Sequence, residues 1–149
     1  MSKPLHIPTM AMMASEGKEP DILFWVGCAG SFDARAQKVT VAFCKILNEV
    51  GINFAILGNE ESCTGDPARR AGNEFIFQMS ALQNIETLNM YKVKKIVTAC
   101  PHCFNTLKND YPALGGNYEV THHSQYLQEL IDSGKIKMKE GGAFAGKKI

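Results

Sequence analysis

Four short apolar runs, each followed by a segment whose apolar residues recur at helical spacing, constrain the fold of this chain more than any other feature. The runs cover residues 21–26, 53–57, 95–99 and 117–121. Because parallel strands must be joined by crossover connections, which are usually helices, four strand–helix units predict a parallel sheet with helices on both faces. We therefore expect an α/β domain of the doubly wound, Rossmann or flavodoxin-like kind, with about four strands.

The helices expected after these strands cover residues 32–50, about 68–90, 101–111 and 125–134. Pro67 suits the first turn of the second helix. That helix carries an apolar stripe, which is typical of a helix facing the core, and a surplus of apolar residues could face a partner. The stripe consists of Phe75, Phe77, Met79, Leu82, Ile85 and Leu88.

Length and composition favour one domain. The chain has 149 residues, of which 45% are hydrophobic, and a domain of this size buries roughly 70% of the surface of its unfolded chain. The first twenty residues include Pro4, Pro8, Gly17 and Pro20. They predict a loosely held N-terminal arm, residues 1–20, ahead of a domain over residues 21–149.

Charge and hydropathy exclude several classes of function. The formal net charge is +1, which provides no field for binding nucleic acid. The N-terminal segment lacks the apolar core of a signal peptide, and no run approaches the roughly 20 apolar residues of a membrane helix. We expect a cytoplasmic protein without a membrane span and without a nucleic-acid partner.

Four of the five cysteines follow strands. Cys28 lies just after the first predicted strand, Cys63 in the loop after the second, Cys100 directly after the third, and Cys103 one helical turn later. The carboxyl ends of parallel strands meet at one edge of the sheet, where ligands bind, so these thiols are expected to converge. Cys44 lies on the apolar stripe of the first helix and is interpreted as a core residue.

Clustered thiols in a reducing compartment indicate a metal or redox site rather than structural disulfides. Thiolates select zinc or iron–sulfur clusters. The chain has one close pair of cysteines and two distant single ones, and its own core needs no structural zinc. Helix amino termini expected near Ser31, Pro67 and Pro101, with Arg69 and Arg70, would favour an anionic cluster. An iron–sulfur cluster is therefore the favoured interpretation, with a structural zinc site as an alternative.

Three motifs together resemble a known family. They are "GCAG" with Cys28, "ESCTGDPARRAGNE" with Cys63, and "ACPHC" with Cys100 and Cys103. Their order and spacing are similar to the Cys-Cys-Gly cysteine-rich repeat found in the B subunit of heterodisulfide reductase and in related iron–sulfur subunits of glycolate, lactate and glycerol-3-phosphate oxidation. The resemblance covers about residues 22–130.

This resemblance implies a [4Fe-4S] cluster held by the four cysteines, and a role in electron transfer or disulfide reduction. In the heterodisulfide reductases the cluster is of a noncubane type. The implied partners are a second repeat or another redox subunit, and a flavoprotein or ferredoxin-like electron donor. A purified sample could also contain empty thiols or zinc in place of the cluster.

The chain departs from the family pattern at two points. Where the family has two adjacent cysteines before glycine, this chain has Cys63-Thr64-Gly65, so a five-thiolate noncubane site cannot be built in the same way. Four cysteines could hold an ordinary cubane cluster, or Thr64 and Asp66 could leave one iron open to a substrate thiol. The family members carry two repeats, and the "GGAFAGKKI" segment resembles a lead into another strand, so we expect the N-terminal half of a two-repeat protein.

A thioredoxin-like dithiol oxidoreductase is the main alternative from another class. Cys100-Pro101-His102-Cys103 is also the active-site sequence of such enzymes, with Cys100 as nucleophile, Cys103 as resolving thiol and His102 adjusting the thiolate. This alternative leaves Cys28 and Cys63 unexplained, and the pair follows the third strand rather than the first.

Several charged residues complete the list of candidates. His122 and His123 follow the fourth strand and could donate protons, although capping or surface roles are the alternative. Asp66, Arg69 and Arg70 are expected to orient the Cys63 loop through ion pairs. Glu61 is expected to be solvated.

Overall fold

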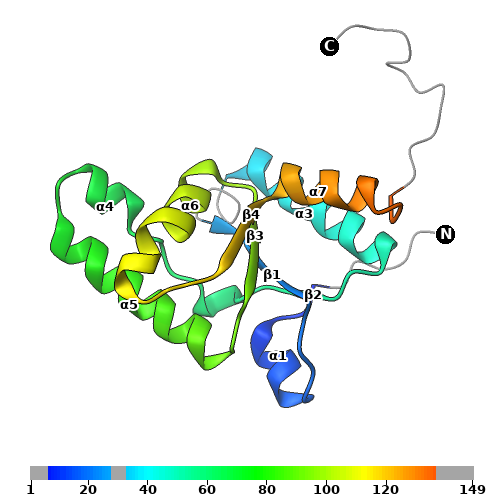
Figure 1. Ribbon diagram of the computed structural model, residues 1–149, viewed down its shortest axis with the longest axis horizontal. Coiled ribbons are helices and arrows are strands. Elements are labelled where there is room, and N and C mark those ends of the chain that lie inside the picture. Colours follow the sequence, from blue (N-terminus) through cyan, green and yellow to red (C-terminus); the bar gives the residue numbers. More distant parts are fainter. Residues whose placement is uncertain (1–6, 28–32, 137–149) are drawn as a thin grey trace, which may run out of the picture.

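Four parallel strands form the centre of the computed structural model, which describes residues 7–27 and 33–136 (Figure 1). The sheet has the order β2-β1-β3-β4. Leu23 of β1 pairs with Ala55 of β2 on one side and with Ile96 of β3 on the other, and β3 pairs with β4. The strands are β1 (Ile22–Trp25), β2 (Phe54–Ala55), β3 (Lys95–Thr98) and β4 (Glu119–His122).

Helices cover both faces of this sheet, which confirms the predicted doubly wound α/β class (Figure 1). Ile22 and Phe24 of β1 pack in one buried cluster with residues of α3 (Ala34–Val50) and α7 (His123–Asp132). Leu23 and Trp25 point to the other face and pack with residues of α5 (Glu74–Met90) and of the segment after β3. That segment contains α6 (Pro101–Asn105), a π-helical turn η2 (Thr106–Asp110) and a 3-10 turn η3 (Tyr111–Leu114).

The order in which the chain adds strands to the sheet reverses between β1 and β3. From β1 the chain first crosses to β2 at one edge, and it later continues to β3 and β4 on the other side. Such a reversal separates the loops that follow the two central strands and creates a crevice at their carboxyl ends. The segments that carry Cys63 and Cys100 meet at this crevice.

The single helix expected over residues 68–90 is wrong, because the chain forms two helices there. The first is α4 (Asp66–Arg70), and the second is α5. Gly72 has φ of +84° and Asn73 caps α5 by accepting a hydrogen bond from the N–H of Ile76 at 3.2 Å. A glycine in the left-handed region followed by a capping residue ends one helix and begins the next.

The apolar stripe predicted for this helix is core-facing only in part. Phe77, Ile85 and Leu88 are buried, as expected. Phe75, Met79 and Leu82 are exposed, with 73%, 58% and 50% of their surface accessible, so these residues form the apolar surplus that was expected to be able to face a partner. The buried and the exposed apolar residues could not be separated beforehand, because an apolar pattern in the sequence does not specify which side of the helix packs against the sheet.

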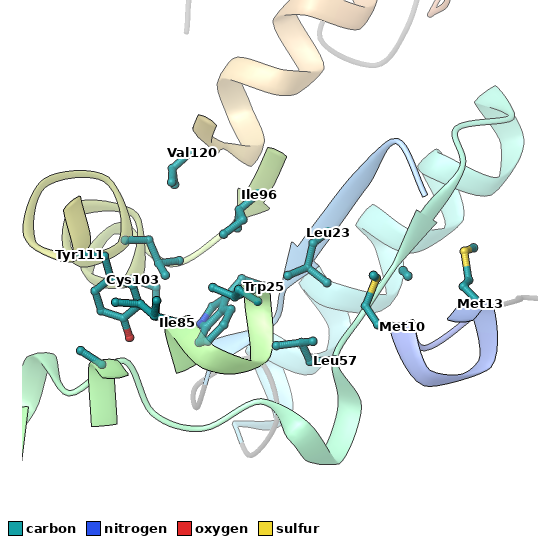
Figure 2. Close-up of a cluster of buried hydrophobic side chains, with 14 of the residues drawn as sticks. Met10, Met13, Leu23, Trp25, Leu57, Ile85, Ile96, Cys103, Tyr111 and Val120 are labelled. Atoms are coloured by element: carbon teal, nitrogen blue, oxygen red, sulfur yellow. The ribbon is translucent and has the colours of Figure 1, made fainter. Parts of the chain in front are cut away.

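The part of the N-terminal arm that the structure describes is packed rather than loosely held. Residues of α1 (Met10–Ser15) follow a parallel bridge between Thr9 and Ile56 at the β2 edge. The N–H of Met10 donates to the carbonyl of Ile56 at 2.8 Å. Met10 and Met13 lie at one end of the buried cluster whose other end contains Cys103 (Figure 2).

Two further features complete the described chain. A short 3-10 turn, η1 (Gly58–Glu60), leads from β2 towards the Cys63 segment. Among residues 7–27 and 33–136, no helix is both long enough and apolar enough to cross a membrane.

Candidate metal centre

A cavity of about 150 Å³ lies at the carboxyl ends of β1 and β3, where the strand order reverses. Three of the four predicted cysteine ligands, Cys63, Cys100 and Cys103, line it together. The fourth, Cys28, lies outside the described residues. The structure therefore brings three thiols from two distant segments to one cavity, as the strand positions predict.

A larger hollow of about 440 Å³ lies at the opposite edge of the sheet, between α1 and the segment before β3. No cysteine lines it. The cysteines line the smaller cavity.

The two thiols of the Cys100–Cys103 pair differ in pKa. Cys100 caps α6, and its Sγ accepts a hydrogen bond from the N–H of Cys103 at 3.5 Å. The hydrogen bond from the Cys103 thiol, helped by the N–H groups of Cys103 and His102, lowers the pKa of Cys100 to about 5. The same thiol–thiolate bond, with burial, raises the pKa of Cys103. Without metal, Cys100 is therefore the thiolate and Cys103 retains its proton at neutral pH.

A buried polar network of Asn84 and Tyr111 holds the backbone of the loop that carries Cys63. Asn84 of α5 is fully buried, and its Nδ2 donates to the carbonyls of Cys63 at 2.9 Å and Ser62 at 3.3 Å. The hydroxyl of Tyr111 donates to the carbonyl of Thr64 at 3.0 Å and accepts from Asn84 Nδ2 at 3.2 Å. Sequence reasoning missed both residues. The available signal was an asparagine on the buried side of an otherwise apolar helix.

Gly65 allows the Cys63 loop to approach α5 closely. Its φ is +91°, and a Cβ at this position would lie 2.9 Å from Cδ2 of Phe77 and 3.1 Å from the Phe77 carbonyl oxygen. Only glycine fits this conformation and this gap without displacing the helix. The Cys63 side chain remains exposed at the rim, while Thr64 is buried.

Glu61 is half-buried and joins two loops of the site, so the expectation that it is solvated is wrong. Its carboxylate accepts hydrogen bonds from the N–H groups of Val26 at 2.9 Å and Gly27 at 2.6 Å, directly after β1. Burial raises the pKa of Glu61 to about 7, and the two main-chain bonds act in the opposite direction. Glutamate is usually solvated in loops, and only the tertiary structure places the end of β1 over this side chain.

The charged residues at the rim form a local network. Asp66 pairs with Arg70 at 3.0 Å, and Arg70 Nη2 lies 2.7 Å from Nδ1 of His102. Asp66 also accepts a hydrogen bond from the hydroxyl of Thr106 at 3.4 Å. The network links α4, which follows the Cys63 loop, to α6, which carries Cys103. Arg69 pairs instead with Asp110.

His122, the last residue of β4, and His123, the first residue of α7, do not line the cavity. His122 caps α7, with its Nδ1 2.7 Å from Oγ of Ser124 and its Nε2 3.2 Å from the carbonyl oxygen of Ala99. The His123 ring packs edge-on against Phe43, and burial, followed by the neighbouring His122, lowers its pKa. Capping and packing account for both side chains here, and the predicted proton-donor role stays a prediction.

The donor set fits a thiophilic metal group. Within residues 7–27 and 33–136, no three cysteine, histidine, aspartate or glutamate side chains lie close enough together to hold one metal ion. Cys63 and the Cys100–Cys103 pair line the cavity from separate segments of the chain. Gly27 has φ of +79°, and a Cβ added there would lie in van der Waals contact with Sγ of Cys103 at 3.4 Å. Soft sulfur donors spread around an open space suit a cluster of several metal ions.

Comparison with known proteins identifies the family. Residues 22–108 match a family model described as a cysteine-rich domain, CCG. The chain belongs to the CCG cysteine-rich domain family. The match confirms the resemblance drawn from the three cysteine motifs, and all four predicted ligand positions of the CCG domain fall inside it.

Relatives of this CCG domain are much longer proteins. The chain is 51% identical to the "Probable iron-sulfur-binding oxidoreductase FadF" of Bacillus subtilis, over 89% of this chain and 19% of the relative. It is 48% identical to the EtfAB:quinone oxidoreductase of Syntrophomonas wolfei, over 85% of this chain and 18% of the relative. It is 36% identical to the D subunit of the dihydromethanophenazine:CoB–CoM heterodisulfide reductase of Methanosarcina barkeri, over 80% of this chain and 30% of the relative.

The chain therefore spans less than a third of the length of each of these relatives. No solved structure matches it.

Proposed function

We propose that this CCG domain binds an iron–sulfur cluster and transfers electrons as part of a heterodisulfide-reductase-like oxidoreductase. The observation that carries the proposal is the convergence of Cys63, Cys100 and Cys103 on one cavity at the carboxyl edge of the sheet. The names of the relatives, which describe an iron–sulfur-binding oxidoreductase and a component of a heterodisulfide reductase, support it.

The proposed ligands are Cys28, Cys63, Cys100 and Cys103, which would hold a [4Fe-4S] cluster. Thiolates are the usual ligands of such clusters. When bound, the cluster would supply one-electron transfer. The lowered pKa of Cys100 favours the thiolate form that a metal ligand must take, whereas the raised pKa of Cys103 opposes it.

The residues around the ligands would hold the site in shape before metal arrives. Glu61 ties the end of β1 to the segment that leads to Cys63. Asn84 fixes the Cys63 carbonyl, and the Asp66–Arg70 pair links the two cysteine-bearing segments through His102. Such preorganisation lowers the entropic cost of assembling ligands from separate segments.

The proposed partners follow from the size of the relatives. Since the chain matches less than a third of each, we propose that a second CCG repeat or another redox subunit completes the electron path. A flavoprotein or ferredoxin-like protein would supply electrons.

A dithiol oxidoreductase is the second candidate. The observation that favours it is the pairing of a Cys100 thiolate with a protonated Cys103, neither of which is in a disulfide. In that case Cys100 would attack a substrate disulfide and Cys103 would resolve the mixed disulfide.

Iron and acid-labile sulfide, measured on protein purified without oxygen, distinguish these functions. We expect both in the unaltered chain, together with the visible absorption of a cluster, and we expect Cys28→Ser and Cys63→Ser to lose them. Cys44→Ala is the matched control, because Cys44 is buried in the core between α3 and the sheet and should leave the cluster intact. Absence of iron and sulfide after reconstitution, with Cys100 alkylation unchanged in Cys63→Ser, would instead establish the dithiol.

A further inference from the structure

The hollow of about 440 Å³ lies away from the candidate metal centre, at the amino ends of β1 and β3. It shares no lining residue with the cysteine cavity. In Figure 1, α1, which lines the hollow, lies below the sheet, whereas α6, which carries Cys103, lies above it. The volume is within the range of small-molecule sites, which is roughly 300–1,000 Å³. The proposed electron-transfer function makes no use of this hollow.

Four lysines give the lining of the hollow an excess of positive charge. The charged lining residues are Lys18, Lys92, Lys94 and Lys95, with the carboxylates of Glu19 and Asp21. Lys18 and Lys95 form ion pairs with glutamates outside the hollow. Lys92 and Lys94 are exposed, and neither forms an ion pair within residues 7–27 and 33–136. Two neighbouring ammonium groups without a carboxylate partner favour an anionic ligand.

Lys92 has an unusual backbone conformation for a lysine. Its φ is +56°, and in the part of the chain that the structure describes it is the only residue other than glycine with positive φ. The turn that ends α5 imposes this conformation, because the N–H of Lys92 donates to the carbonyl of Asn89 at 3.1 Å and the N–H of Val93 donates to the carbonyl of Leu88 at 3.0 Å. Glycine is the usual residue at this place in a helix end, since a Cβ disfavours the left-handed region. Strain of this kind is typical of residues whose side chain has a function.

The inner wall of the hollow is apolar and well ordered by packing. Met10 and Leu23 line it, and both are buried in the same core cluster. Tyr91 lines it as well, and its hydroxyl donates a hydrogen bond to the carboxylate of Glu60, which restricts the tyrosine ring. A planar aromatic group can pack against an aromatic ring and an apolar wall of this kind.

We propose that this hollow is a second binding site, which takes a nucleoside phosphate. The base would pack against Tyr91 and the apolar wall, and the phosphate groups would bind the ammonium groups of Lys92 and Lys94. A lysine binds phosphate as a point charge with three donors. The combination of an apolar wall with unpaired lysines fits a ligand that has both an aromatic and a strongly anionic part. The site does not depend on the proposed cluster, because the two sites share no residue.

Isothermal titration calorimetry with adenosine diphosphate tests the proposal on the full chain. The buffer contains about 0.15 M salt, so that weak attraction between exposed charges is screened. We expect saturable binding of adenosine diphosphate. Adenosine lacks the anionic part and pyrophosphate lacks the aromatic part, so each should bind about tenfold more weakly or worse.

Lys92→Gly separates a role in binding from a role in stability. Glycine relieves the left-handed backbone, so this variant should unfold at the same urea concentration as the unaltered chain or at a higher one. We nevertheless expect it to bind adenosine diphosphate about tenfold more weakly, and Lys94→Ala should have a similar effect. Lys45→Ala is the matched control, because Lys45 is an exposed lysine of α3 that does not line the hollow, and it should leave the affinity unchanged.

Three results would overturn the inference. Absence of saturable binding at millimolar adenosine diphosphate would show that the hollow takes no nucleotide. Pyrophosphate that binds as tightly as adenosine diphosphate would show a site for any small anion. Equal weakening in Lys45→Ala and Lys92→Gly would show attraction to the positive charge of the whole surface. None of these results bears on the iron and sulfide content of the unaltered chain, which tests the proposed function separately.

Discussion

At the scale of single residues, Glu61 connects two loops through hydrogen bonds of its carboxylate. It belongs to the segment that leads to Cys63, yet its carboxylate binds the main chain directly after β1, one residue before Cys28. The Glu61 side chain therefore has a structural role, although a glutamate in a loop is ordinarily solvated. Its protonation should therefore affect stability.

In the metal-free chain, the contribution of Glu61 to stability should fall as pH rises from about 4.5 to about 7, while the lowered pKa of Cys100 acts in the opposite direction. Burial raises the pKa of Glu61 from 4.5 to about 7, so the folded state binds a proton that the unfolded state has released. Glu61 contributes about 3 kcal/mol to the free energy of unfolding below pH 4.5, and this contribution is lost as pH rises past 7. Urea unfolding at several pH values measures it. Relative to the unaltered chain, Glu61→Gln should become more stable as pH rises across this range, whereas Glu60→Gln should not; equal slopes in both variants would contradict the assignment.

Gly65 should tolerate alanine poorly. Gly65→Ala combines a left-handed backbone with a contact of 2.9 Å to Phe77, so we expect a loss of about 2–4 kcal/mol in the free energy of unfolding. Gly72→Ala is the control, because Gly72 also has positive φ but a Cβ there would meet nothing within 4 Å. Its cost should be about 1–2 kcal/mol. Similar costs at the two positions would show that contact with α5 does not matter.

At the level of elements, α5 supports the site without contributing a ligand. One side of the helix packs on the sheet, and Asn84 on that side reaches the Cys63 loop. The break after α4 separates the short helix that follows the cysteine from this support. The two helices can therefore take different directions, which a continuous helix over residues 68–90 would not allow.

Asn84→Leu should loosen the Cys63 loop. The change removes the donors for the carbonyls of Ser62 and Cys63 and leaves these groups unsatisfied, at a cost of about 2–4 kcal/mol. Faster amide hydrogen exchange in residues 62–65 of the metal-free chain would be the direct sign. Asn89→Leu alters an asparagine of the same helix whose side-chain oxygen accepts from the hydroxyl of Tyr118, away from the loop, and it should leave exchange in the loop unchanged. A rigid loop in Asn84→Leu would show that other contacts hold it.

At the level of the whole molecule, one buried cluster extends from α1 to the cavity. It contains Met10 and Met13 at the β2 edge, Trp25 and Leu57 in the middle, and Cys103 at the far end (Figure 2). The N-terminal segment therefore belongs to the same packed unit as the candidate metal centre. The exposed part of α5 lies outside this unit, with Phe75 and Met79 accessible.

The N-terminal segment should contribute measurably to folding. Met10→Ala removes a side chain that is 4% exposed, and we expect a loss of about 2–4 kcal/mol in the free energy of unfolding. Met12→Ala, two residues later and 48% exposed, should change it by less than about 0.5 kcal/mol. Urea unfolding of both variants checks the comparison. Equal small effects would mean that α1 is not part of the core.

Local sequence pattern was sufficient to predict the sheet, the helices on both faces and the family. Alternation of apolar runs with helical segments restricts the chain to a doubly wound α/β fold, and cysteines placed after strands must approach one edge. These inferences depend only on the spacing of residues along the chain and on the common direction of parallel strands. They therefore required no knowledge of which side chains touch.

The surroundings of the cysteines, in contrast, are set by tertiary packing. The burial of Glu61, the support from Asn84 and Tyr111, and the inward position of Thr64 each depend on contacts between residues more than twenty positions apart. The division of α5 into a buried and an exposed side is of the same kind. Local pattern does not encode such contacts, because burial and hydrogen-bond partners are set by how elements pack together.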